Sequence, residues 1–102
     1  MYKPAEIRTV TVLNHFHVRL EFADGAVREL DLDPYLRGPV FQPLRDDPVL
    51  FAAARVEDGT ITWPNGADID PDVLYLGLPP NATEAEWHAA QVHHMTVKDR
   101  KP

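Results

Sequence analysis

Three aspartates at alternate positions, Asp68, Asp70 and Asp72, form the densest group of chemically capable side chains in this sequence. Their spacing matches the first three ligands of an EF-hand calcium loop. The rest of the loop does not match. Val73 stands where that loop needs a glycine for its sharp turn, and Pro79 stands where it needs a bidentate glutamate. The sequence therefore argues against calcium at this position.

The same acids fit the start of a helix. Asp70 followed by Pro71 is typical of an N-cap with proline at the first helical position, and Gly77 ends the short helix that this start predicts. Asp72 in the first turn would face the positive end of the helix dipole. Asp70 and Asp72 are thus predicted to serve the backbone, and Asp68 is left without an assigned role.

The loop that begins at Trp63 has two interpretations. In the first it is a packed corner, in which Trp63 fills the core and Asp68 ties a turn at Asn65. In the second it binds a ligand, with Trp63 as a stacking wall and Asp68 as the polar anchor. The packed corner is favoured because tryptophan is mostly buried. The candidate binding residues are Trp63, Asn65, Asp68 and, in a predicted C-terminal helix, Trp87.

The histidines match the pattern of a metal site only in part. His15 and His17 lie two apart in a predicted strand and would project from one face, as in some β-sheet metal sites. A third ligand is not indicated, because His88, His93 and His94 lack the i, i+4 spacing of a helical zinc site. We expect His15 and His17 to occupy the polar face of an antiparallel sheet, and we expect neither a metal nor a cofactor.

Composition excludes several kinds of chemistry. The chain has no cysteine and no serine, so thiolate and serine nucleophiles are absent, and we expect a protein that is not an enzyme. Its net charge of −6 argues against direct binding of nucleic acid or an anionic membrane. No signal peptide is indicated, and no apolar run approaches the roughly 20 residues that span a bilayer. We expect a cytoplasmic protein.

The first half of the sequence predicts a meander of three antiparallel strands. Apolar and polar residues alternate over residues 7–13 and 16–22. Asp24-Gly25 is typical of a two-residue hairpin, and residues 26–32 supply the returning strand. The period of two slips between Val27 and Leu30. A bulge or an early end to the pairing is therefore expected in between.

The second half predicts shorter elements. Asp47 followed by Pro48 begins a short helix that ends near Arg55, and Asp58-Gly59 joins a second hairpin that ends at Trp63. Thr83 and Glu86 match a capping box that opens a C-terminal helix. The fold class is α+β, with a three-stranded meander, a small second hairpin, short helices and a C-terminal helix. Residues 1–78 form the α+β domain, and residues 79–102 form the C-terminal helix and a frayed tail.

Three segments carry a resemblance to a known family: FADG, DLDPYLRGPVFQPLRD and LFAAARVEDGTITWPNGADIDPDVLY. Over residues 6–78 the chain resembles the small bacterial family called domain of unknown function 2442, most specifically in the run from Trp63 to Asp68. The resemblance implies an α+β fold of small antiparallel sheets with short helices, and it transfers no catalytic residue. Some relatives are fused to a helix-turn-helix domain, for which the roughly 25 residues after Gly77 are too few.

Other relatives are encoded beside a small protein of the domain-of-unknown-function 4160 family, which suggests toxin–antitoxin pairing. We therefore expect a non-enzymatic protein-interaction module, the antitoxin-like partner of a basic protein from a neighbouring gene. A homodimer through strand edges or the last helix is a further arrangement that the sequence leaves open. The alternative function is a small-molecule or metal-responsive sensor or enzyme that uses the Trp63–Asp72 loop.

Overall fold

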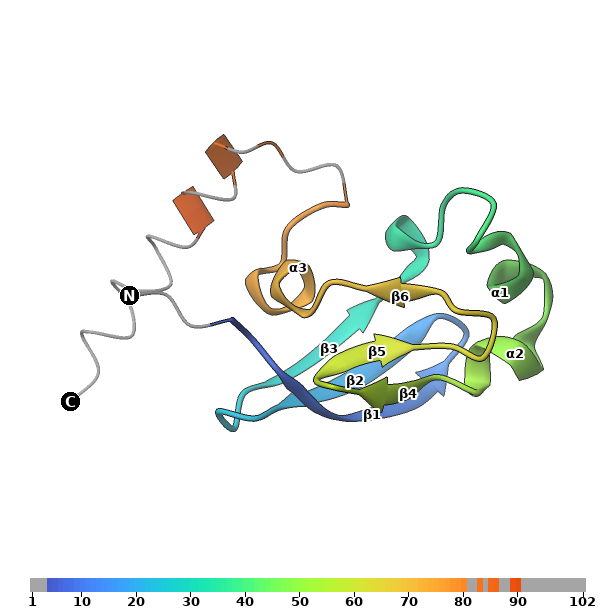
Figure 1. Cartoon of the computed structure of the whole chain (residues 1–102), viewed down its shortest axis with the longest axis horizontal. Coiled ribbons are helices and arrows are strands. Elements are labelled where there is room, and N and C mark those ends of the chain that lie inside the picture. Colours follow the sequence, from blue (N-terminus) through green and yellow to red (C-terminus); the bar gives the residue numbers. More distant parts are fainter. Residues whose placement is uncertain (1–3, 81–82, 84, 87–88, 91–102) are drawn as a thin grey trace.

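A computed structural model of the chain describes residues 4–80, 83, 85–86 and 89–90, and it has the expected α+β fold (Figure 1). Its elements, in chain order, are β1 (Ile7–Asn14), β2 (His17–Phe22), β3 (Val27–Asp31), the 3-10 helix η1 (Asp33–Tyr35), α1 (Gln42–Asp46), α2 (Pro48–Ala52), β4 (Arg55–Glu57), β5 (Thr60–Thr62), β6 (Asp68–Ile69) and α3 (Pro71–Leu76). None of the helices in this described part of the chain has the length and apolar character needed to cross a membrane.

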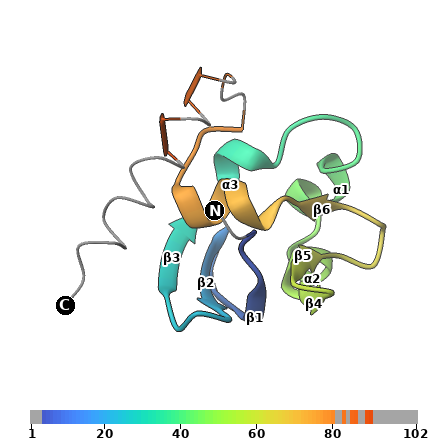
Figure 2. The ribbon, with the colours of Figure 1, turned by 60° about the vertical axis from the view of Figure 1, so that its left-hand side comes forward.

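The strands form two antiparallel sheets of three, in the orders β1-β2-β3 and β4-β5-β6. The predicted meander is the first sheet. The sheets meet where β1 begins, because the backbone N–H of Ile7 donates a 2.8 Å hydrogen bond to the carbonyl of Gly59 in the β4–β5 turn. Figures 1 and 2 show α3 lying over the first sheet, and α1 and α2 lying together at one end of the molecule.

The inner face of β2 supplies the centre of the core. Alternation places one set of its residues inside and the other in solvent, as the period of two predicts. The buried side chains are Val18, Leu20 and Phe22, and those of His17, Arg19 and Glu21 are exposed. The buried set joins a single cluster to which both sheets, α1, α2 and α3 contribute side chains, and Tyr35 of η1 packs against it.

The expectation of a bulge in β3, or of an early end to its pairing, is wrong. Pairing between β2 and β3 is regular along the whole of β3, and the register shifts of the first sheet lie in β1 instead. Val27 is on the solvent side, 48% exposed, whereas Arg28 and Leu30 share the inner side. The guanidinium of Arg28 lies 5.1 Å from the ring centre of Tyr75. The period of two thus continues because an arginine stem takes the place where the sequence suggested an apolar residue.

The two hairpin turns differ from each other. The β4–β5 turn has the expected two residues, with positive φ at Asp58 (52°) and Gly59 (79°), as a type I′ turn requires. The β2–β3 loop has three residues, 23–25, rather than the expected two. The N–H of Phe22 donates to the carbonyl of Ala26 across this loop, and Gly25 takes a φ of 92°. A type I turn followed by a left-handed glycine accounts for the extra residue.

Very short elements account for the other differences. The second hairpin is confirmed, but its sheet has a third strand, β6, that the sequence did not indicate. The five-residue helix α1, in a segment rich in proline, was also not expected, and α2 ends at Ala52 rather than near Arg55. A two-residue strand and a one-turn helix are too short to show hydrophobic periodicity.

The capping box after the domain is confirmed. The N–H of Thr83 donates to the Glu86 carboxylate at 2.9 Å, and the N–H of Glu86 donates to the Thr83 hydroxyl at 3.2 Å. The backbone hydrogen bond from Thr83, supported by its side chain, lowers the pKa of Glu86. Trp87 and the predicted frayed tail lie outside the described residues.

Candidate functional site

The side chain of Trp63 fills the corner between the two sheets and α2. It is 2% exposed, and its indole N–H donates a 2.9 Å hydrogen bond to the carbonyl of Phe51. The ring centres of Trp63 and Phe51 lie 5.7 Å apart. The turn that follows closes on the same residue, because Gly66 donates to the Trp63 carbonyl and the Trp63 N–H donates to Ala67. This arrangement matches the packed corner, since a stacking wall for a ligand needs an exposed ring face.

Asn65 and Asp68 lie near this corner with exposed side chains. The Asn65 amide donates to the carbonyl of Val40 at 2.9 Å and accepts the N–H of Ala67 at 3.2 Å, so it ties the turn to the loop before α1. Asp68 is in β6, opposite Thr62 of β5. The structure therefore brings Trp63, Asn65 and Asp68 into one region, and it describes nothing of Trp87. A binding role for these four residues remains a prediction.

The other two acids contact the backbone. Asp70 accepts the N–H of Asp72 at 2.9 Å and caps α3, which ends at Gly77 with a φ of 70° as expected. Asp72 has a role that the sequence did not indicate. Its carboxylate accepts the N–H of Ala5 at 2.7 Å, and so fastens the segment before β1 to α3. The two residues are 67 positions apart, which explains why no local pattern predicts the contact.

We expect Asp70→Ala to lower the free energy of unfolding by about 1 kcal/mol, because the cap of α3 is lost. Asp68→Ala is the matched control, since Asp68 is exposed in a strand and caps no helix; its change should stay within about 0.5 kcal/mol. Urea unfolding followed by circular dichroism measures both, with EDTA and with added Ca²⁺. Equal losses for the two variants, or a gain of stability with Ca²⁺ that Asp70→Ala abolishes, would contradict the capping role.

The two N-terminal histidines do not share a strand. His15 lies in the tight turn between β1 and β2, with a φ of 53°, and its ring centre is 4.1 Å from that of Phe16. His17 opens β2 and pairs with Asn14. The expectation of two histidines side by side on one strand face is therefore wrong, because residues 15 and 16 form the turn and the strand begins only at His17. Across the described residues, no three His, Asp or Glu side chains lie close enough to hold a metal ion.

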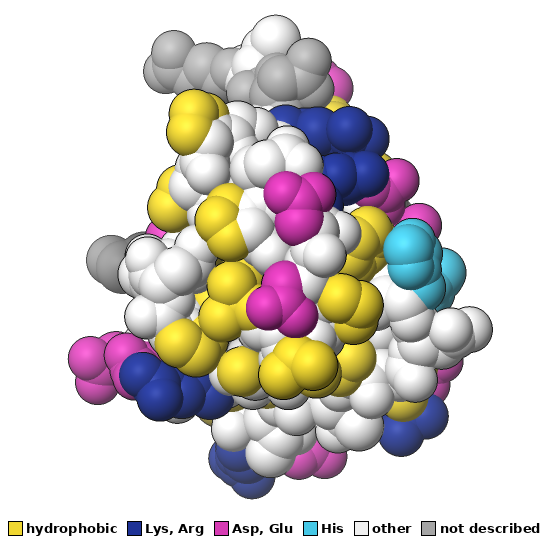
Figure 3. Space-filling model, turned by 90° about the vertical axis from the view of Figure 1, so that its right-hand side faces the viewer, with side chains coloured by type: hydrophobic (Ala, Val, Ile, Leu, Met, Phe, Trp, Pro, Cys, Tyr) yellow, Lys and Arg dark blue, Asp and Glu magenta, His cyan; other side chains and the backbone are white. Residues whose placement is uncertain are grey.

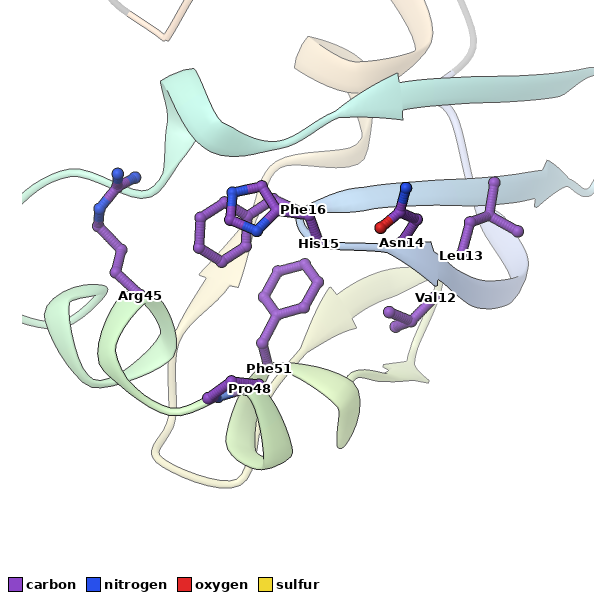
Figure 4. A pocket seen from close by; sticks show the side chains of 8 residues that line it. All are labelled: Val12, Leu13, Asn14, His15, Phe16, Arg45, Pro48 and Phe51. Carbon is purple, nitrogen blue, oxygen red and sulfur yellow. The ribbon is translucent and has the colours of Figure 1, made fainter.

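A pocket of about 230 Å³ opens beside this turn, between the end of β1 and α2 (Figure 4). It is lined by Val12, Leu13, Asn14, His15, Phe16, Arg45, Pro48 and Phe51. Its aromatic side chains belong to the core. Phe16 and Phe51 are 7% and 2% exposed and meet edge to face, with ring centres 5.1 Å apart. The pocket is therefore a hollow in the hydrophobic core that opens at the surface.

Arg45 forms a polar side of the pocket, but its charge is already matched. Its guanidinium donates to the carboxylate of Asp33 and lies 5.3 Å from the ring centre of Phe16. The hydrogen bond from Arg45, together with the charges of Arg45 and Arg37, lowers the pKa of the Asp33 carboxyl. Among the lining residues the imidazole of His15 is the one general acid–base group, and no carboxylate, hydroxyl or thiol stands beside it in the lining to act with it. The arrangement suits the binding of an apolar group better than acid–base or nucleophilic chemistry.

Two exposed apolar side chains adjoin this pocket. Leu13, which lines it, is 41% exposed, and Val49, next to Pro48 in α2, is 79% exposed. Figure 3 shows hydrophobic side chains gathered over this end of the molecule, with acidic groups among them. Sequence reasoning missed the pocket because residues 12–16 and 45–51 meet only in the fold. Leu13, an apolar residue at the end of the alternating strand, was the available signal.

Comparison with models of protein families gives a match over most of the chain. The model of the family described as "Protein of unknown function (DUF2442)" matches residues 7–80. The chain belongs to this DUF2442 family. The match spans both sheets and α3, so the pocket and the Trp63 corner both lie within the family domain. No match was found among the curated proteins or the solved structures compared with the chain.

Proposed function

We propose that this DUF2442 protein is a non-enzymatic protein-interaction module, the antitoxin-like member of a pair whose other member is a basic protein. The observation that carries the proposal is an exposed apolar end, around Leu13 and Val49, on a strongly acidic domain. Residues 4–80 contain thirteen aspartates and glutamates against six arginines and no lysine. With Trp63 buried, the loop after it offers less to a ligand than this surface does.

Charge and apolar area have different roles in such a complex. An acidic surface speeds the encounter with a basic partner and rejects acidic ones. The exposed apolar side chains supply the area that is removed from water once the partner has docked. The combination favours a protein partner over nucleic acid, whose phosphates an acidic domain repels.

The test is co-expression of the full chain with the product of the adjacent open reading frame. We expect the two proteins to copurify at low salt, and we expect their association rate to fall at least tenfold between 50 mM and 500 mM NaCl, because salt screens the attraction between exposed charges. Association rates are measured by surface plasmon resonance. A clean co-expression experiment that recovers no partner at low salt, or an association rate that does not change with salt, would contradict the proposal.

A further inference from the structure

We propose that the pocket between β1 and α2 receives one large apolar side chain, leucine or aromatic, from a basic segment of a partner protein. This inference rests on the proposed function and assigns the surface and the chemistry of the bound segment.

The size of the pocket favours a single side chain. Its volume of about 230 Å³ lies below the roughly 300–1,000 Å³ of pockets that hold drug-sized ligands and cofactors. Binding energy at protein interfaces is concentrated in a few anchors that enter well-packed, desolvated hollows of this kind. The rings of Phe16 and Phe51 supply such a hollow, and Val12 and the exposed Leu13, at the end of β1, continue its lining.

The charges around the pocket favour basic residues on either side of that anchor. Arg45 is held by Asp33 and offers no unmatched cation to an acidic segment. Asp46 and Asp47 are exposed directly before Pro48 of the lining, where a lysine or arginine of a bound segment can approach them. A second copy of this chain is a poor occupant, because two domains with the same acidic excess repel each other.

The first experiment uses peptide probes and methyl NMR on the full chain. The probe is Lys-Lys-Gly-Leu-Gly-Lys-Lys; one comparison peptide has alanine in place of leucine, and another has glutamate in place of every lysine. We expect the leucine peptide to shift the methyl signals of Val12 and Leu13. The alanine peptide should bind at least tenfold more weakly, because it buries less apolar surface, and the glutamate peptide should not bind.

Leu13→Lys is the decisive variant, and Val27→Lys is its matched control. The two residues are 41% and 48% exposed and belong to the same sheet, but Val27 adjoins the β2–β3 loop, away from α2 (Figure 1). Both variants carry the same charge, and exposed positions of this kind tolerate substitution. We expect Leu13→Lys to weaken binding of the leucine peptide at least tenfold and Val27→Lys to change it less than twofold. The uncharged variant Leu13→Ala should weaken it about threefold.

Three results would overturn the inference: equal affinity for the leucine and alanine peptides, binding of the glutamate peptide, or equal effects of the two lysine variants. Saturable binding of free indole without any peptide response would assign the pocket to a small molecule and would also overturn it. The complex with the adjacent gene product separates this inference from the proposed function. A complex that survives Leu13→Lys contradicts the pocket as the docking surface, whereas the absence of any complex with the unmodified chain contradicts the proposed function.

Discussion

Replacing Trp63 with alanine is expected to lower the free energy of unfolding by about 3–5 kcal/mol, the usual cost of removing a large aromatic side chain from a core. The indole is 2% exposed and lies against the ring of Phe51, so its loss opens a cavity between the second sheet and α2. It also leaves the carbonyl of Phe51 without the indole N–H. A loss of this size is a large part of the roughly 5–15 kcal/mol that stabilises a typical domain.

Urea unfolding at pH 7 measures this loss, and Trp63→Phe gives a second value if the alanine variant does not fold. Phenylalanine keeps a ring in the corner but donates no hydrogen bond, so we expect a loss of about 1–3 kcal/mol. Val49→Ala is the control, because Val49 is 79% exposed, and its change should stay within about 0.5 kcal/mol. A Trp63→Ala variant that keeps its stability but loses the partner would instead support the binding role that the sequence suggested.

Tyr75→Phe is expected to lower the free energy of unfolding by about 1–2 kcal/mol at neutral pH. The Tyr75 hydroxyl donates to the carboxylate of Asp24, across the gap between α3 and the β2–β3 loop. Its ring meets Phe22 edge to face and lies under the guanidinium of Arg28. The substitution keeps both ring contacts and removes the hydrogen bond, so it isolates that bond.

The same bond predicts a dependence on alkaline pH. Burial, with the hydrogen bond and charge of Asp24, raises the pKa of Tyr75 from 10.0 to about 12. Because the pKa is higher in the folded state, the stabilisation is complete below about pH 10 and is lost as the pH rises toward 12. We expect the difference in unfolding free energy between the unmodified protein and Tyr75→Phe to shrink over this interval.

The difference between the two proteins cancels the contributions of the other tyrosines to the pH dependence. One of these is Tyr35, because burial raises its pKa as well. Urea unfolding at pH 7, 10 and 11.5 gives the free energies, and absorbance at 295 nm follows the phenolate directly. A difference that stays constant up to pH 11.5 would show that Tyr75 ionises as it would in the unfolded chain, and would contradict the pH dependence.

The features that the sequence predicted correctly depend on neighbouring residues. Alternation in β2, the turn at Asp58-Gly59 and the caps at Asp47 and Asp70 each involve side chains and backbone groups within a few positions. Local rules are sufficient for such features because their energies are set within one turn or one strand. The family resemblance also rested on short stretches of sequence, most specifically on the run from Trp63 to Asp68.

The features that the sequence did not predict depend on distant residues. The sequence suggested that Val27 faces the core. In the structure Val27 faces solvent, and Arg28 lies on the opposite face of β3, over the ring of Tyr75 in α3. The pocket is formed by two segments that are separated by about thirty positions and share no pattern, so only their packing creates it. Sequence reasoning could identify Leu13 as an apolar residue at a strand end, but not the hollow beside it.

The contacts of α3 also affect how the chain folds during its synthesis. Asp72 holds the segment before β1, and Leu74 and Tyr75 are buried in the core. On the ribosome, therefore, the inner side chains of the first sheet, Phe22 among them, stay in water until almost the whole domain has emerged. Nascent chains that stop before residue 70 would expose this apolar face to chaperones, and release of α3 from the exit tunnel would complete the core.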